Sequence, residues 1–282
     1  MSTRRDYLAS AKDRLKGILN DEQRRTWRRQ LAEPAGLIFR RDLRRLAVIY
    51  GSDKWNSHWY AQHYQHHFYR SRRKKITLLE IGIGGNDDPQ GGGGSLRMWR
   101  RFFPFATIVG LDLYDKSAHA EPRIRVFQGD QEDERFLRRV IDDIGPPDII
   151  IDDGSHINRH VTRTFEVLFP MLADDGIYAI EDTQTSYWRE YGGSSEDLIS
   201  APTTMARMKG LADGLNYEEL TLPGYVPSYF DQNVCALHFY HNLVFIQKGS
   251  NREGSSRRQA PPSVPVDPSS PWCAPGSTGV ES

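Results

Sequence analysis

The chain has few cysteines, no net charge and no long hydrophobic stretch. Its two cysteines, Cys235 and Cys273, among 282 residues argue against a disulfide framework or a thiolate metal site and fit a reduced cytoplasm. Lys and Arg together total 37, as do Asp and Glu, so no overall field attracts nucleic acid or an anionic membrane. No run approaches the roughly 20 apolar residues of a membrane helix, and the N-terminus lacks a signal sequence. We therefore expect a cytoplasmic protein with no nucleic-acid or membrane partner.

The sequence divides by composition into four parts. Residues 1–48 are rich in Lys and Arg, with apolar positions at helical spacing, and predict a small N-terminal helical appendage. Residues 49–74 are rich in aromatics and histidine. Residues 75–250 carry the pattern of one α/β domain. Residues 251–282 are rich in Pro, Ser and Gly, which predicts a disordered tail.

The aromatic and histidine-rich segment at 51–69 allows more than one interpretation. His63 and His67 are four residues apart and could place two zinc ligands on one helical face. No third ligand is near in sequence, and aromatic-rich helices more often pack on a core or cover a pocket. We favour a lid over a ligand.

From residue 75 onward, short β-branched runs alternate with amphipathic helical periods. This alternation predicts a doubly wound, mostly parallel sheet with helices on both faces. The stretch VCALHFYHNLVFIQKG predicts an antiparallel hairpin that turns near His241 and Asn242 and completes seven strands. Such a hairpin distinguishes the class I methyltransferase sheet from other Rossmann-like folds, so we predict that α/β fold.

A glycine-rich turn follows the first predicted strand, in the sequence Glu80-Ile81-Gly82-Ile83-Gly84. Glycine there lets the backbone approach a ligand at the carboxyl edge of the sheet. The dinucleotide fingerprint is missing, because a helix does not follow directly. The run GGGGS at 91–95 could be a flexible linker. We instead expect Ser95 to cap the next helix, with backbone N–H groups near the zwitterionic end of a cofactor.

Two further acids end the next two predicted strands. Asp112 falls where such a sheet presents a carboxylate to ribose hydroxyls, although a solvated turn aspartate would have the same pattern. Asp130 is placed to accept a hydrogen bond from an adenine amino group. Together with the glycine-rich turn, these acids form the predicted cofactor site.

Acidic pairs end two neighbouring parallel strands: Asp152-Asp153 after PDIII and Glu181-Asp182 after GIYAI. One such pair alone is usually a helix cap or a solvated turn. Two pairs at one edge would repel unless a hard divalent cation with oxygen ligands, magnesium or manganese, lies between them. Such a metal could bind a substrate hydroxyl while His156 removes its proton.

A second histidine could act as the base instead of His156. His160 lies one turn further along the predicted helix that follows Asp153. The position of His156, three residues after a predicted metal ligand, favours it as the base. If His156 is not the base, it would cap the following helix or pack against it.

The motifs LEIGIGG, GLDLYDKS, IRVFQGDQ, DIIIDDGSHIN and IEDTQTSYW resemble the metal-dependent O-methyltransferases of antibiotic deoxysugars, such as the mycinamicin, oleandomycin and elloramycin tailoring enzymes. The resemblance spans roughly residues 50–252 and implies S-adenosylmethionine and Mg²⁺ as cofactors and a glycosylated small molecule as acceptor. It assigns Asp153, rather than Asp152, to the metal. The full set of implied residues is: metal ligands Asp153, Glu181 and Asp182, base His156, and cofactor contacts from the loop Glu80, Gly82 and Gly84 and from Ser95, Asp112 and Asp130.

The short N-terminal part departs from the macrolide-modifying members, which carry a larger helical auxiliary domain. A shorter region would suit members that methylate rhamnose-type sugars on polyketides. A homo-oligomer is expected. The alternatives are a metal-dependent nucleotide-sugar transferase, which needs basic residues for phosphate, and a cofactor-binding protein without turnover.

Overall fold

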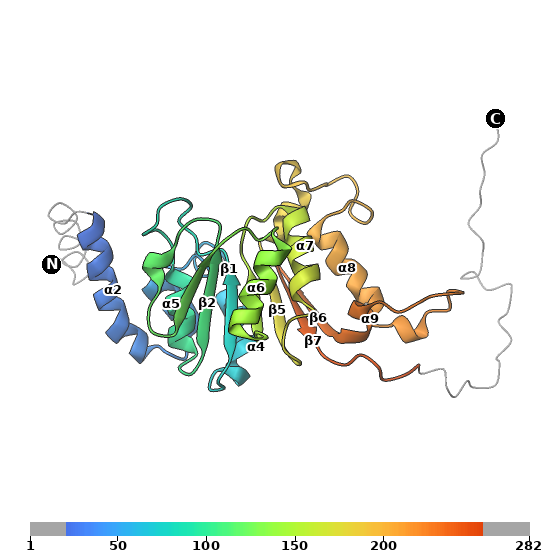
Figure 1. Cartoon of the computed structure of the whole chain (residues 1–282), viewed down its shortest axis with the longest axis horizontal. Helices are drawn as coiled ribbons and strands as arrows, with labels where there is room; N and C mark the ends of the chain where they lie inside the picture. The colour runs from blue at the N-terminus through green and yellow to red at the C-terminus, as the bar shows by residue number, and fades with distance from the viewer. Residues whose placement is uncertain (1–20, 256–282) are drawn as a thin grey trace, which may run out of the picture.

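The computed structural model describes residues 21–255. Residues 1–20 of the predicted appendage and residues 256–282 of the predicted tail, Cys273 among them, lie outside the described part. Within it, the chain forms one seven-stranded sheet flanked by helices (Figure 1).

The sheet has the strand order β3-β2-β1-β4-β5-β7-β6. The first five strands in this order, β3, β2, β1, β4 and β5, are parallel. Strand β7 pairs antiparallel with both β5 and β6. The predicted hairpin is confirmed, with Asn242 at φ 60° in its turn. The strands are β1 (Thr77–Ile81), β2 (Thr107–Asp112), β3 (Ile124–Gln128), β4 (Ile149–Asp152), β5 (Ile177–Glu181), β6 (Val234–Tyr240) and β7 (Leu243–Lys248).

Each face of the sheet has its own apolar core. Helices α3, α4 and α5 bury Leu46, Phe68 and Trp99 against one face. Helices α6, α7 and α8 cover the other face, and α6 and α7 lie in front of the strands in Figure 1. The helices are α2 (Asp21–Ile38), α3 (Leu43–Tyr50), α4 (Ala61–Phe68), α5 (Gly94–Phe102), α6 (Glu134–Ile144), α7 (Asn158–Leu168), α8 (Thr204–Gly214) and α9 (Tyr229–Asn233).

Helix α3 crosses the boundary predicted after residue 48. Asp42 caps its first turn by accepting from the Arg45 N–H, and Gly51 ends it in the left-handed conformation at φ 71°. Leu43 and Leu46 are fully buried in the same core as the sheet. The buried stripe of this helix therefore contributes to one of the two cores of the sheet, and the domain boundary stays a prediction.

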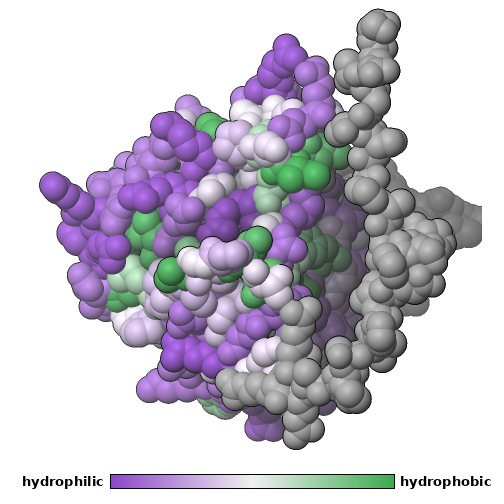
Figure 2. Space-filling view, turned by 90° about the vertical axis from the view of Figure 1, so that its right-hand side faces the viewer, coloured by the Kyte–Doolittle hydropathy of each residue, from purple (hydrophilic) through white to green (hydrophobic). Residues whose placement is uncertain are grey.

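The molecular surface is predominantly polar on the face in Figure 2, where hydrophobic residues are scattered among hydrophilic ones. In the described part of the chain, no helix combines the length and hydropathy that crossing a bilayer requires.

The histidines of α4 pack against the β6–β7 hairpin. The His67 ring stacks on Phe245 at 4.1 Å, and the His63 ring stacks on Tyr240 at 3.8 Å between centroids. His238 lies edge-on to His67 at 4.6 Å. Among the described residues, this cluster does not form a group that could ligate one metal. The aromatic helix therefore packs on the core.

Acid should loosen this packing. Burial, with the nearby His238, His66 and His63, lowers the pKa of His67 to about 4. A histidine with a depressed folded-state pKa stabilises the fold above its unfolded pKa, near 6.5, and loses that contribution as the pH falls towards 4. We expect His67→Phe to reduce the loss of stability between pH 6.5 and 4 by on the order of 1–2 kcal/mol, after discounting for partial exposure. Urea unfolding at both pH values measures this; an unchanged pH slope would contradict it.

Candidate active site

A cavity of about 730 Å³ opens at the carboxyl ends of the parallel strands. The loop after β1, the ends of β2 and β4, and the segment at 51–53 all contribute to its wall. A cavity at this edge is where doubly wound sheets bind ligands. Of the predicted site residues, the cavity is lined by Gly82, Gly84, Ser95, Asp112, Asp130, Asp153, His156 and Asp182.

The glycine loop is tightly packed. At Gly82, where φ is +88°, a Cβ would lie 2.0 Å from the backbone oxygen of Asp153, so no side chain fits. The backbone of the GGGGS run is held in place, because Gly93 N–H donates to Ile83 O at 2.9 Å and Gly91 N–H donates to Asp88 O at 2.9 Å. The run is therefore a structured wall of the cavity rather than a linker.

The sequence suggested that Ser95 caps the following helix, but the structure shows that it does not. Gly93 occupies the N-cap position, and Ser95 lies inside α5 with its hydroxyl donating to Glu80 Oε2 at 2.7 Å. Gly93 can take this position because its φ of 72° is accessible to glycine. Glu80 itself is fully buried and is not part of the cavity wall; as a cofactor contact it remains a prediction.

Asp112 and Asp130 were predicted to contact the ribose and the adenine of the cofactor. Their carboxylates accept hydrogen bonds from backbone N–H groups in turns. Asp112 accepts from the Ile83 and Tyr114 backbone N–H groups, both at 2.9 Å. Asp130 accepts from Glu132 N–H at 2.9 Å. Each carboxylate oxygen has a second lone pair, so both aspartates are oriented and can still accept a hydrogen bond from a ligand.

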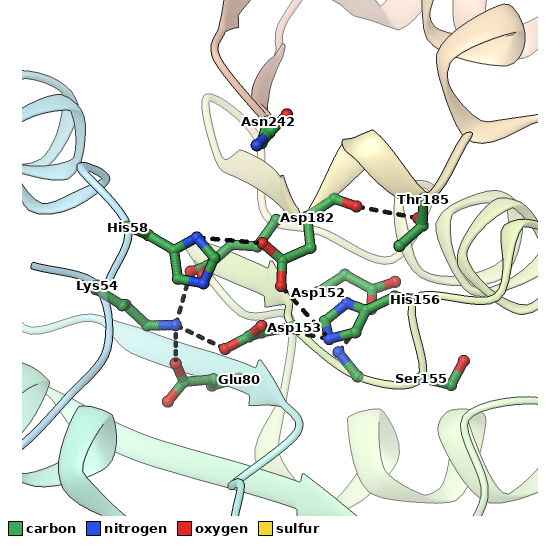
Figure 3. A network of polar contacts seen from close by, with 12 residues as sticks. Lys54, His58, Glu80, Asp152, Asp153, Ser155, His156, Asp182, Thr185 and Asn242 are labelled. Atoms are coloured by element: carbon green, nitrogen blue, oxygen red, sulfur yellow. Dashed lines mark hydrogen bonds and ion pairs between the residues drawn. The ribbon is translucent and has the colours of Figure 1, made fainter. Parts of the chain in front are cut away.

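Asp153, His156 and Asp182 come together at the floor of the cavity. Their possible ligand atoms all lie within 4.8 Å of one another. The His156 Nε2 is 3.6 Å from Asp182 Oδ2 and 4.0 Å from Asp153 Oδ1 (Figure 3). Both His156 and Asp182 have left-handed backbone conformations, at φ 58° and 53°. Non-glycine residues rarely adopt this conformation, which is concentrated at functional sites.

The other acid of each pair lies outside this group. Glu181 is buried, and its Oε1 accepts from Tyr64 Oη at 2.5 Å and lies 2.7 Å from Lys54 Nζ. Burial and the nearby Asp153 raise its pKa well above the usual range, against the opposing effect of Lys54. Asp152 is buried near Gln131 and Tyr178. The structure thus places Glu181 behind the three clustered side chains rather than among them.

Lys54 is a site residue that the sequence did not reveal. Its fully buried Nζ lies 2.7 Å from Asp153 Oδ2 as well as from Glu181 Oε1. Burial alone would lower the pKa of Lys54, but Asp153, Glu181 and Glu80 together raise it well above its usual value. The ammonium therefore stays charged at neutral pH.

Two tyrosines from the same segment also reach the acids. Tyr60 Oη donates to Asp182 Oδ1 at 2.7 Å, and Tyr64 Oη donates to Glu181. Burial raises the pKa of Asp182, but the hydrogen bond from Tyr60 and the charges of His156 and His58 outweigh it, and the net pKa is lowered. The segment expected to be a lid supports the acids from behind, and residues 51–53 line the cavity.

His160 is held away from the acidic group. Its Nδ1 is 3.0 Å from Ser155 Oγ, and its Nε2 is 2.9 Å from Glu132 Oε2. Both ring nitrogens thus have partners, whereas the His156 ring faces Asp153 and Asp182. This geometry favours His156 over His160 as the base.

Comparison with known proteins identifies close relatives. No protein-family model matches the chain. It is 46% identical over 215 residues to the mycinamicin VI 2''-O-methyltransferase of Micromonospora griseorubida, and 47% identical over 215 residues to the demethylmacrocin O-methyltransferase of Streptomyces fradiae. Each alignment covers 76% of this chain and 54% of the relative. An 8-demethyl-8-alpha-L-rhamnosyl tetracenomycin-C 2'-O-methyltransferase of Streptomyces olivaceus is 46% identical over 207 residues, covering 73% of this chain and 54% of the relative.

A solved structure of one relative has a similar fold. The MycE methyltransferase of the mycinamycin biosynthetic pathway, in complex with Mg and SAH, superimposes with a TM-score of 0.76 at 45% identity, covering 79% of this chain and 57% of that one. The predicted class I methyltransferase fold is thereby confirmed, and so is the resemblance to antibiotic sugar O-methyltransferases over the aligned residues.

The chain spans about half the length of the curated relatives it matches. That share is 54% both for the macrolide relative and for the relative that acts on a rhamnosyl tetracenomycin. The expectation that a shorter N-terminal part suits a rhamnose-type acceptor stays a prediction.

Proposed function

We propose that this chain is an S-adenosylmethionine-dependent and Mg²⁺-dependent O-methyltransferase that acts on a sugar hydroxyl of a glycosylated natural product in antibiotic biosynthesis. The observation that carries the proposal is the group formed by Asp153, His156 and Asp182 beside a glycine-walled cavity. It occurs in a chain 44% identical to MycE, whose structure in complex with Mg, SAH and mycinamycin VI is known.

The donor set suits a hard divalent cation. Asp153 and Asp182 offer carboxylate oxygens at one point, and such oxygens are the ligands that magnesium prefers. We assign these two aspartates to the metal together with Glu181, which reaches the same edge from behind. When bound, the metal would act as a Lewis acid that lowers the pKa of the acceptor hydroxyl.

The chain's own residues would remove the proton of the acceptor hydroxyl and bind the cofactor. His156 would take the hydroxyl proton at Nε2, and the carboxylate of Asp182, 3.6 Å away, would favour the imidazolium that results. The Gly82–Gly84 backbone, Ser95, Asp112 and Asp130 would hold the cofactor, so that its methyl group lies near the acids.

The cavity wall argues against a nucleotide-sugar transferase. A diphosphate requires cationic contacts, and the described residues that line this cavity include neither lysine nor arginine. S-adenosylmethionine has no phosphate and needs no such contact.

The decisive assay uses the full 282-residue chain with methyl-labelled S-adenosylmethionine. Desmethyl macrolide glycosides and rhamnosyl aromatic polyketides serve as acceptors. We expect label in the acceptor's sugar, loss of transfer in EDTA and recovery with excess Mg²⁺.

Calorimetry with S-adenosylhomocysteine separates the alternatives. Binding without turnover on either acceptor class would favour a non-catalytic cofactor-binding protein, and no binding to folded protein would reject the methyltransferase proposal. The expected homo-oligomer remains a prediction.

A further inference from the structure

One buried ammonium joins three strand ends. Lys54, in the loop between α3 and α4, lies 2.7 Å from Asp153 after β4, 2.7 Å from Glu181 at the end of β5 and 3.3 Å from Glu80 in β1. Figure 3 shows its side chain entering this group from the side opposite His156. The Lys54 side chain is fully buried, as is that of Glu80.

This arrangement needs a physical explanation. Buried charges are costly unless they are paired. Three carboxylates meet one ammonium here, and Asp182 adds a fourth carboxylate nearby. Among the described residues, Lys54 is the one cation paired with Glu80 and Glu181, whereas Asp153 and Asp182 also lie near His156. Without Lys54, these two glutamates would face Asp153 with no cation between them in the metal-free protein.

The two oxygens of Asp153 have different surroundings. Its Oδ2 pairs with Lys54, while its Oδ1 faces His156 Nε2 at 4.0 Å, on the cavity side. A cation bound on the cavity side can therefore share Asp153 with Lys54 and need not displace it.

We propose that Lys54 is the resident counter-cation of the site: it positions Asp153 and Glu181 in the metal-free protein and shares these carboxylates with the metal when one binds. The proposal rests on the metal site of the proposed function. It makes Lys54 a positioning residue, and it implies that the fold tolerates metal loss because this ammonium remains.

Removing the ammonium should make the fold depend on the metal. Lys54→Met keeps a long apolar side chain but leaves the acids unpaired, so we expect the Tm in EDTA to fall by about 10 °C. Excess Mg²⁺ should restore about half of this loss, because the metal then supplies the missing positive charge. Differential scanning fluorimetry of the full chain, with EDTA and with MgCl₂, gives the Tm difference for variant and wild type.

Lys248→Met is the matched control. Lys248 is also buried, but its Nζ donates to the backbone oxygens of Pro170 and Leu172. Its substitution should lower the Tm equally with and without Mg²⁺. If Lys54→Met also lowers both values equally, Lys54 has a packing role and the proposal is overturned.

A second variant keeps the test decisive if Lys54→Met does not fold. Lys54→Met combined with Glu80→Gln removes one positive and one negative charge together. If Lys54→Met does not fold, we expect the double variant to regain a cooperative unfolding transition in EDTA. If Lys54→Met does fold, we expect the double variant to have a higher Tm in EDTA than Lys54→Met itself and than the sum of the two single effects. Losses that simply add, or a double variant that also fails to fold, would refute charge balance as the role of Lys54.

Failure of the metal site is detected separately. Calorimetric titration of the wild-type chain with MgCl₂ tests that site directly, and no binding would reject the proposed function. The double-variant comparison in EDTA involves no metal, so it still decides whether Lys54 positions the acids.

Discussion

Replacing Asp153 with asparagine should lower Mg²⁺-dependent methyl transfer by about 10³-fold, which corresponds to roughly 4 kcal/mol of lost transition-state stabilisation. Asp153 is the acid that faces both Lys54 and His156. Asparagine has nearly the same shape but no charge, so it weakens metal binding and breaks the pair with Lys54. Initial rates with labelled S-adenosylmethionine at saturating acceptor, across a range of Mg²⁺ concentrations, measure the loss.

Asp152→Asn is the control for this substitution. Asp152 lies next to Asp153 in sequence, but it is buried against Gln131 and Tyr178 on the other side of β4. Its substitution should reduce the rate by less than tenfold. Equal losses at both positions would contradict the assignment of the metal to Asp153, and an unchanged rate in Asp153→Asn would reject it.

This contrast also shows how far the sequence can specify the site. Parallel strands place their carboxyl ends at one edge, so both acidic pairs could be predicted to lie together. Which acid of each pair faces the cavity could not be predicted from the residues alone. The left-handed conformation of Asp182, at φ 53°, turns it towards His156, while Glu181 ends a strand and stays buried.

Lys54 could not have been identified from local patterns. It lies 99 residues before Asp153 in sequence, and the segment around it, GSDKWNSHWY, is notable for aromatics rather than for charge. Periodicity and propensity report on neighbours along the chain, whereas this contact arises from how α3 and α4 pack on the sheet. The β6–β7 hairpin, by contrast, was predictable because strand pattern and turn residues are local.

Replacing His156 with glutamine should lower kcat by about 10²- to 10⁴-fold, the usual contribution of a general base. Glutamine can still form a hydrogen bond to Asp182, but it cannot accept the proton of the acceptor hydroxyl. The KM for S-adenosylmethionine should stay within about threefold, since the base acts on the acceptor and the cofactor site is formed by other residues. Steady-state kinetics with each substrate varied in turn separates the two constants.

His160→Gln distinguishes the two histidines. Because both His160 ring nitrogens have partners in Ser155 and Glu132, this substitution should disturb the cavity wall and raise the KM for the cofactor more than it lowers kcat. The opposite pattern, a large loss of kcat in His160→Gln with His156→Gln nearly intact, would assign the base to His160, in the first turn of α7. The metal site would survive that result, because the carboxylates of Asp153 and Asp182 meet at the cavity floor whichever histidine removes the proton.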